Sequence, residues 1–360
     1  MARNRTAAGV VASLAVAAWL AASASAASWN PKAAAAYLDQ RTAGWMNGGG
    51  RIDHGTFCVS CHGALPYALA RGALRAGLGE REPCATERRL LDSVSKRVRM
   101  WQEVQPFLGG GAPSRGTECV ENALILVTRD APGGALSDDA RQAVDTMWAR
   151  QLKSGKNAGA WPWFGDGGGG EEPWEAFDSQ YWGATLAGVA VGTMPQAYGS
   201  DNADNLKLLQ GYLRGGQSTQ SLHNRLTLLW AADKWPDLLT AEQRQAIVTA
   251  VLAKQHADGG WSVSDLVAPA WRRFDGSPQE TTSDGYATGL ATFVLEQSGP
   301  AGPRPGIDAA RAWLMANQDA ATGAWPARSW NKRRDPASDV GRFMSDAATA
   351  YAVLALTSGG

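Results

Sequence analysis

One pattern occurs three times in this 360-residue chain and constrains its fold more than any other feature. It consists of a glutamine, a glycine-x-tryptophan turn, a polar loop and then an aspartate before an apolar segment. The three copies are Gln151, Gly159, Trp161 and Asp178; Gln255, Gly259, Trp261 and Asp284; and Gln318, Gly323, Trp325 and Asp346. Self-similarity in a fixed order, at a period of roughly 50 to 70 residues, indicates a repeat architecture.

The segments on the two sides of each turn distribute their apolar residues differently. The segment before a turn is amphipathic, as at Ala246, Val248 and Val251, whereas the following segment is apolar on nearly every side, as in 286–295 and 347–356. A helix that is apolar all round is buried. Each unit therefore predicts an outer helix followed by an inner helix.

Extending this rule predicts an all-α fold of six helix pairs, with no strand. Outer helices are expected near 31–46, 83–107, 137–153, 200–214, 240–256 and 306–318. Inner helices are expected near 62–77, 117–130, 177–193, 218–233, 281–298 and 344–357. Six such pairs close most naturally into an (α/α)6 toroid over residues 27–360, and an open superhelical solenoid is the alternative.

The Gln–Gly–x–Trp turns resemble the QW repeats of squalene–hopene cyclases, most closely in the tracts 252–261 and 314–325. The resemblance implies the α/α-toroid of the terpenoid cyclase and protein prenyltransferase superfamily. It also implies that the glutamine and tryptophan tie one helix end to the next unit. A glutamine amide can satisfy orphan backbone groups at a helix end.

The active sites of that superfamily do not carry over to this chain. The D-x-D-D acid motif of class II cyclases and the G-C-G-E-Q thioester motif are both absent. The last cysteine is Cys119, so the zinc site that prenyltransferases build in their later repeats cannot form. A fold alone does not assign a function. The resemblance leaves one hypothesis, namely a protein that binds or transforms a hydrophobic terpenoid or lipid in the toroid lumen.

The N-terminal residues 1–26 have the pattern of a signal peptide. Arg3 and Arg5 precede an apolar stretch, and the tripeptide 24–26 is a small-residue cleavage site. This predicts export, most simply to a bacterial periplasm, with no membrane span after cleavage; an uncleaved anchor is the alternative. The chain has 34 basic and 34 acidic side chains, which gives no electrostatic footprint for nucleic acid.

The segment Cys58-Val-Ser-Cys61-His62 is a C-x-x-C-H motif. In an exported protein this pattern predicts covalent haem c, with Cys58 and Cys61 binding the vinyl groups and His62 ligating the iron. A redox disulfide, a zinc site that uses the same three residues and a structural disulfide are the alternatives. The leading hypothesis is therefore an exported haem protein for electron transfer or redox sensing, with a redox partner protein.

A closed toroid would place the starts of all its inner helices at one rim. This rim is expected to collect His62, Cys119, Asp178, His223, Asp284 and Asp346. The sixth iron ligand is expected there, with His54 and His223 ahead of Met46, His256 and Met344, or else with an open position. Catalytic residues cannot be named from the sequence.

Cys84 and Cys119 are the two cysteines outside the motif. An exported protein can form a disulfide between them. However, the expected helix boundaries place the two residues at opposite ends of a helical hairpin, well beyond the roughly 7 Å between Cα atoms that a disulfide allows. A disulfide and two buried thiols both stay open.

Overall fold

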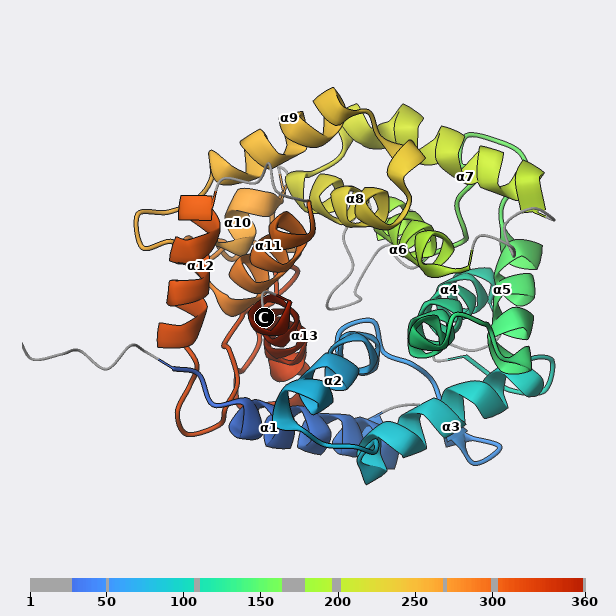
Figure 1. Cartoon of the computed structure of the whole chain (residues 1–360), viewed down its shortest axis with the longest axis horizontal. Helices are drawn as coiled ribbons and strands as arrows, with labels where there is room; N and C mark the ends of the chain where they lie inside the picture. Colours follow the sequence, from blue (N-terminus) through green and yellow to red (C-terminus); the bar gives the residue numbers. More distant parts are fainter. Residues whose placement is uncertain are drawn as a thin grey trace, which may run out of the picture.

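The computed structural model describes residues 28–49, 52–106, 111–163, 179–195, 202–267, 271–298 and 304–358. Helices form two concentric layers around one axis (Figure 1). The outer helices are α1 (Pro31–Gly44), α3 (Ala85–Arg99), α5 (Asp138–Arg150), α7 (Ala203–Gly216), α9 (Ala241–Leu252) and α12 (Arg304–Ala316). The inner helices are α2 (Ala64–Leu78), α4 (Ala112–Asp130), α6 (Ser179–Thr193), α8 (Leu222–Lys234), α11 (Gly285–Gln297) and α13 (Asp339–Thr357). The predicted signal peptide lies outside the described residues.

The inner layer closes on itself. Each inner helix packs on the next in chain order, from α2 through α4, α6, α8 and α11 to α13, and α13 packs on α2. Outer helix α1 also contacts α13, so the first and last repeats meet (Figure 1). The predicted all-α fold of six helix pairs is thus confirmed, and it is the closed toroid rather than the open solenoid.

Burial explains why the inner helices are apolar on every side. All residues from Gly285 to Leu295 of α11 are buried, because α8, α13 and α12 contact this helix from different sides. Small residues allow these helices to approach closely. A Cβ atom added at Gly289 of α11 would lie 2.8 Å from the backbone nitrogen of Ala352 on α13.

The three repeated glutamines each join two units. The Nε2 group of Gln151 donates to the carbonyls of Gly159 and Asn205, at 3.1 and 3.0 Å. Gln255 makes the same pair of bonds to Gly259 and Gly306. In each case the first carbonyl belongs to the glutamine's own turn and the second lies at the start of the next outer helix.

The third glutamine closes the ring. Gln318 donates to Gly323 in its own turn at 2.8 Å and to the carbonyl of Asn30 at 3.1 Å. Its Oε1 atom accepts the Asn30 N–H at 2.6 Å. Because Asn30 caps α1, this contact joins the last repeat to the first. The tethering role that the resemblance implies is present in all three copies.

The repeated tryptophans seal the same turns from inside. Trp161, Trp261 and Trp325 are fully buried. Their indole N–H groups donate to carbonyls in the last turn of the preceding outer helix, at 2.6, 2.8 and 2.8 Å. These three tryptophans are therefore structural.

The glycine of each turn is required by the backbone. Gly159, Gly259 and Gly323 have φ angles of 101°, 93° and 80°, in the left-handed region that favours glycine. Each also touches the next outer helix. A Cβ atom at Gly259 would lie 2.7 Å from the carbonyl oxygen of Ala309, and one at Gly323 would lie 2.5 Å from that of Ala33.

A short hairpin is the main difference from the expected helical pairs. Strands β1 (Ile52–Asp53) and β2 (Thr56–Phe57) pair in antiparallel fashion between α1 and α2. His54 and Gly55 form its turn with φ angles of 50° and 69°, as a two-residue primed turn needs. Strands of two residues give no alternating pattern, which is why the sequence did not reveal them. A one-turn helix, α10 (Val263–Leu266), was likewise not expected.

Two inner helices begin one turn or more before the expected positions. Helix α4 begins at Ala112, so Cys119 lies within it, and α13 begins at Asp339, so Asp346 lies two turns in. Cys84 caps α3 through its sulfur, which accepts the Glu87 N–H, and Cys119 donates to Gly116. The two cysteines do not form a disulfide, because one begins an outer helix and the other lies inside an inner helix.

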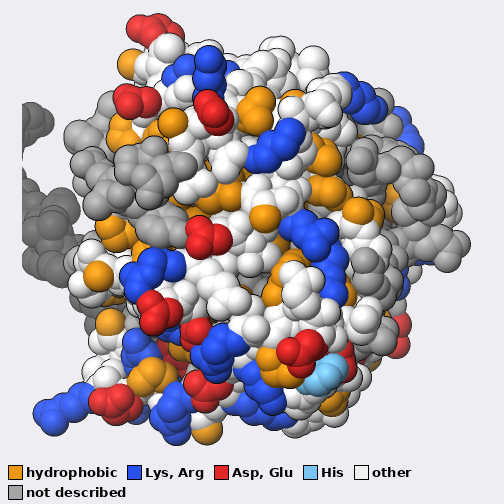
Figure 2. All heavy atoms as spheres, turned by 90° about the vertical axis from the view of Figure 1, so that its right-hand side faces the viewer, with side chains coloured by type: hydrophobic (Ala, Val, Ile, Leu, Met, Phe, Trp, Pro, Cys, Tyr) orange, Lys and Arg blue, Asp and Glu red, His pale blue; other side chains and the backbone are white. Residues whose placement is uncertain are grey.

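The outer surface carries both charges in a mixed arrangement. Figure 2 shows basic and acidic side chains interspersed on one side of the ring, with isolated hydrophobic groups between them. This distribution agrees with the equal numbers of basic and acidic residues in the sequence. None of the helices in the described part of the chain combines the length and the apolar character needed to cross a bilayer.

Candidate functional site at the inner-helix rim

The segment from β2 to α2 places the C-x-x-C-H residues at the rim. Ser93 of α3 accepts the Phe57 N–H, and the indole of Trp45 donates to the carbonyl of Cys58 at 2.8 Å. Ser60 then accepts the Gly63 and Ala64 N–H groups and so begins α2. These contacts hold the segment in the wall of the rim.

Cys58, Cys61 and His62 are all buried there, with exposed fractions of 1%, 8% and 7%. Burial, and next the nearby His223, lower the pKa of His62 to about 3. The imidazole is therefore neutral at physiological pH.

Aromatic rings line this rim beside both histidines. The centroids of His62 and Trp182 are 6.3 Å apart, and Trp163 meets Trp182 edge to face at 5.9 Å. On the opposite side His223 contacts two further rings, those of Tyr286 at 5.9 Å and Trp330 at 4.8 Å. We refer to these six residues as the rim cluster.

A hydrogen bond fixes His223 within the rim cluster. Its Nε2 atom lies 2.9 Å from the Tyr286 hydroxyl, and its Nδ1 atom lies 3.2 Å from the Asn224 side-chain oxygen. Tyr286 is in the first turn of α11, two residues after Asp284. The starts of α8 and α11 are thus joined by side chains as well as by packing.

Deeper in the ring, further aromatic side chains pack on one another. Trp230 meets Phe293 at 5.3 Å, and Tyr351 lies 6.4 Å from Phe293 and 5.7 Å from Tyr286. All of these rings are buried. They fill the space between α8, α11 and α13, where the lumen hypothesis would place a hydrophobic ligand.

A polar pocket of about 280 Å³ adjoins the rim cluster at the start of α11. Its lining includes hydroxyl, amide, guanidinium and carboxyl groups. These come from Arg273, Gln279, Glu280, Thr282, Ser283, Asp284 and Arg328, with Val263, Pro326 and Ala327 completing the wall. Gln279 also donates to the carbonyl of Trp330 at 2.7 Å, so the pocket and the rim cluster share a loop.

Asp284 is the less exposed carboxyl group of this pocket. It caps α11, where Oδ1 accepts the Tyr286 and Ala287 N–H groups at 2.9 Å each and Oδ2 accepts the Val263 N–H at 2.6 Å. Burial outweighs these hydrogen bonds and raises the pKa of Asp284 to about 6. The group therefore holds a proton over part of the weakly acidic range.

Glu280 is the second carboxyl group of the pocket, and its environment differs. Its side chain is 52% exposed and lies 3.7 Å from a guanidinium nitrogen of Arg273. The Arg273 side chain is 2% exposed and is fixed by bonds to the carbonyls of Ser329 and Pro278. The pocket thus holds the less exposed carboxyl group of Asp284 and the solvated carboxylate of Glu280, which lies beside the fixed guanidinium of Arg273.

The structure separates the remaining rim candidates from this pocket. His54 lies in the hairpin turn and pairs with Asp53, and His256 pairs with Asp265 at 2.9 Å. Asp346 lies within α13 and binds Arg41 and Tyr37. Asp178 lies outside the described residues. Of the expected rim set, His62, His223 and Asp284 lie at inner-helix starts.

Glu280 and Trp330 were missed by the sequence analysis. Glu280 stands four residues before the helix-capping Asp284, and this spacing of carboxylates ahead of an inner helix is the signal that could have found it. Within the described residues, no group of three or more His, Cys, Asp or Glu side chains is placed to hold a metal ion.

No protein-family model and no curated protein sequence matches the chain. Two solved structures share its fold. One is a glycosidase variant, with a TM-score of 0.50, 13% identity, and coverage of 91% of this chain and 98% of that one. The other is a glycosidase variant in complex with glucose, with a TM-score of 0.50, 15% identity, and coverage of 91% and 97%.

These comparisons correct the functional hypotheses. The chain resembles glycosidases, so the prediction of a haem protein for electron transfer or redox sensing is wrong, and so is the cyclase-like alternative. The second error arose because the Gln–Gly–x–Trp turns join the repeats, as the bonds of Gln255 and Trp261 show, and a fold alone does not assign a function. The first error arose because the C-x-x-C-H motif was interpreted from five residues alone, whereas in the structure these residues are buried in the wall of the rim. The assignment of Cys58, Cys61 and His62 to a cofactor, and of His62, His223 and His54 to its iron, is not tested and stays a prediction.

Proposed function

We propose that this protein binds a saccharide at the inner-helix rim and hydrolyses a glycosidic bond there. The observation that carries the proposal is the pocket at the start of α11. It places Asp284, whose pKa is raised to about 6, and the solvated Glu280 in one polar wall. Two carboxyl groups with different environments are what glycoside hydrolysis requires.

Asp284 is the general acid in this proposal. Cleavage of a glycosidic bond needs a proton on the departing oxygen, and a carboxyl group whose pKa lies near the working pH supplies it well. Burial gives Asp284 this property. The three backbone N–H groups that bind the carboxylate then stabilise the anion that remains after the proton has left.

Glu280 is the general base. Its half-exposed carboxylate lies beside the guanidinium of Arg273, where it can accept a proton from water. The water oxygen then bonds to the anomeric carbon as the bond to the departing oxygen breaks. One proton moves from Asp284 to the leaving group and one moves from water to Glu280, so the step is balanced.

The rest of the pocket suits a sugar. Gln279, Ser283 and Arg328 add amide, hydroxyl and guanidinium groups that match sugar hydroxyls. A pocket of about 280 Å³ holds a sugar unit rather than a long chain. The rings of Tyr286 and Trp330 are buried in the rim cluster, so they support the rim rather than contact the sugar.

The test is a screen of neutral polysaccharides for released reducing ends, with the wild-type protein and the variants Asp284→Asn and Glu280→Gln. Asparagine still accepts the Tyr286 and Ala287 N–H groups, so the cap of α11 is kept. Asp319→Asn and Glu242→Gln are matched controls, since both make the same chemical change outside the pocket.

We expect each pocket variant to lower kcat by about 100-fold or more, while the controls cleave at the wild-type rate. The wild-type rate should fall as the pH rises above about 6, because Asp284 loses its proton. Cleavage by Asp284→Asn at the wild-type rate, or no cleavage of any polysaccharide by the wild-type protein, would contradict the proposal.

A further inference from the structure

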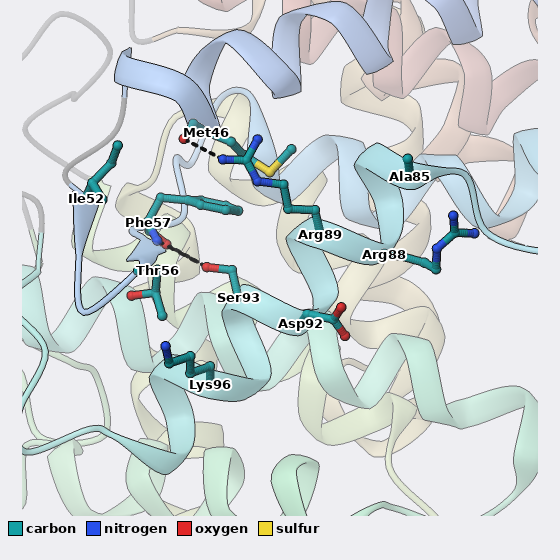
Figure 3. A pocket seen from close by; sticks show the side chains of 11 residues that line it. Met46, Ile52, Thr56, Phe57, Ala85, Arg88, Arg89, Asp92, Ser93 and Lys96 are labelled. Atoms are coloured by element: carbon teal, nitrogen blue, oxygen red, sulfur yellow. Dashed lines mark hydrogen bonds between the residues drawn. The ribbon is translucent and has the colours of Figure 1, made fainter.

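A second pocket lies on the outside of the ring, away from the start of α11. Its volume is about 490 Å³, and it lies between the end of α1, the β1–β2 hairpin and outer helix α3 (Figure 3). It is lined by Met46, Ile52, Gly55, Thr56, Phe57, Ala85, Arg88, Arg89, Asp92, Ser93 and Lys96. None of these residues belongs to the rim cluster.

The pocket has an excess of positive charge. It contains three cationic side chains, Arg88, Arg89 and Lys96, and one acidic side chain, Asp92. Helix α3 supplies all four. An anion in this pocket would therefore meet an attractive field.

The three cations have no carboxylate partner within 4.0 Å among the described residues, although fourteen other such pairs occur there. Their hydrogen bonds go to neutral groups. Arg89 donates to the Asn47 side chain at 2.7 Å and to the carbonyl of Met46 at 3.3 Å, and Lys96 donates to the carbonyl of His54 at 2.7 Å. These bonds orient the cations without neutralising them.

One wall of the pocket is apolar and fixed. Phe57 is held by a hydrogen bond from its N–H to Ser93, and the Arg89 guanidinium lies 5.8 Å from the centre of its ring. Met46 packs beside them, as Figure 3 shows. Ile52 adds a side chain that is 57% exposed, one of the two large hydrophobic residues exposed in the described chain.

We propose that this pocket is a binding site for an anionic sugar, such as a uronic acid or a sugar phosphate. The acidic group binds Arg89, since guanidinium groups match carboxylate and phosphate oxygens. Arg88 extends away from Phe57, and Lys96 lies about two turns farther along α3, so these two cations add to the attractive field (Figure 3). The ring packs on Phe57, Met46 and Ile52. The cations alone indicate that the ligand carries an acidic group. That the rest of the ligand is a sugar rests on the proposed function.

The pocket also has a structural link to the rim. Phe57 ends β2, and the next five residues lead through Cys58 and Cys61 to His62. A sugar on Phe57 would thus be bound on the outer side of the segment whose inner side forms part of the rim. The site is suited to hold an acidic part of a longer saccharide while another part reaches the rim.

Calorimetric titration of the full-length protein tests the proposal. The probes are glucuronate, glucose 6-phosphate, glucose and inorganic phosphate at low ionic strength. The variants are Arg88→Gln, Arg89→Gln and Lys96→Gln, and Arg99→Gln is the matched control. Arg99 lies on the same helix outside the pocket, where it pairs with Asp139.

We expect glucuronate and glucose 6-phosphate to bind at least tenfold more tightly than glucose or inorganic phosphate. Arg89→Gln should weaken this binding at least fivefold, Arg88→Gln and Lys96→Gln should weaken it less, the control should leave it unchanged, and added salt should weaken it. Equal affinity for glucose and glucuronate would overturn the anion site, and equal affinity for inorganic phosphate and glucose 6-phosphate would overturn the role of the apolar wall. Binding that none of the three variants weakens would overturn the location.

The outcome is separable from that of the proposed function. Asp284→Asn should bind the anionic sugars as tightly as the wild-type protein, because Asp284 does not line this pocket. If the wild-type protein binds the anionic sugars but cleaves no polysaccharide, the hydrolytic proposal is wrong and the outer site stands.

Discussion

Gln151 offers the sharpest test of how the repeats are joined. Its Nε2 group donates to two carbonyls, Gly159 in its own turn and Asn205 at the start of the next outer helix, and the residue is 4% exposed. In Gln151→Ala both carbonyls lose their donor, at about 1 kcal/mol each. One buried methylene is lost as well, at about 0.8 kcal/mol.

The expected loss is therefore about 3 kcal/mol, which corresponds to a melting temperature lower by about 4 °C for a chain of this length. The variant Gln151→Glu separates hydrogen bonding from packing, because glutamate has the same shape but cannot donate to the carbonyls when ionised. It should also be less stable than the wild-type protein at neutral pH, although its carboxylate gains an ion pair with Lys153, whose Nζ group already donates to the Gln151 Oε1 atom at 2.9 Å.

Thermal unfolding followed by circular dichroism is the assay. Gln245→Ala is the control, because this exposed glutamine on α9 bonds only to the Thr249 side chain. We expect the control to melt within about 1 °C of the wild-type protein. If Gln151→Glu melted at the wild-type temperature, the tethering role of the glutamine would be refuted.

Three further outcomes follow from the packing and the buried histidine. Gly289→Ala should lower the melting temperature, since its Cβ would lie 2.8 Å from the backbone of α13, whereas Gly211→Ala, with open space around it, should not. Trp261→Phe should destabilise the protein by about 1 kcal/mol or more through loss of its indole hydrogen bond, seen in the same melting assay, and wild-type stability would contradict the sealing role. Burial, and next His223, lower the pKa of His62 from 6.5 to about 3, so its contribution to stability is complete above pH 6.5 and is lost as the pH falls toward 3. His62→Gln should therefore lose less stability than the wild-type protein over that range, and an unchanged pH dependence would contradict this account.

The fold could be predicted because its signals are local and repeated. The positions of Gln255, Gly259 and Trp261 are set by one turn, so the sequence shows the turn directly. Inner helices such as α11 carry no polar face, which distinguished them from outer helices. The hairpin at 52–57 escaped because strands of two residues leave no period, and its turn depends on only two residues with positive φ.

The candidate site could be predicted only in part. The rim argument placed His62, His223 and Asp284 correctly, since each stands at the start of an inner helix. It misplaced Cys119 and Asp346, because one or two additional turns at the start of a helix move a residue away from the rim. The sequence could not show that the Asp284 side chain is less exposed than that of Glu280, because loops distant in the chain determine the exposure of both.

The C-x-x-C-H motif illustrates how a short pattern can mislead about function. Its spacing suits haem attachment, yet the chain resembles glycosidases in fold. In the structure the motif forms the turn that begins α2, with Trp45 and Ser60 binding its backbone. In the proposed function the signal lies instead in Asp284, which the sequence had indicated only as a member of the rim.

The central claim is that water cleaves a glycosidic bond at the start of α11. It is tested most directly by digesting an oligosaccharide cleaved in the screen in water enriched in oxygen-18, followed by mass spectrometry of the products. We predict one labelled oxygen at the new reducing end with the wild-type protein and no product with Asp284→Asn. Products without the label, or labelled product at the wild-type rate from Asp284→Asn, would contradict the claim.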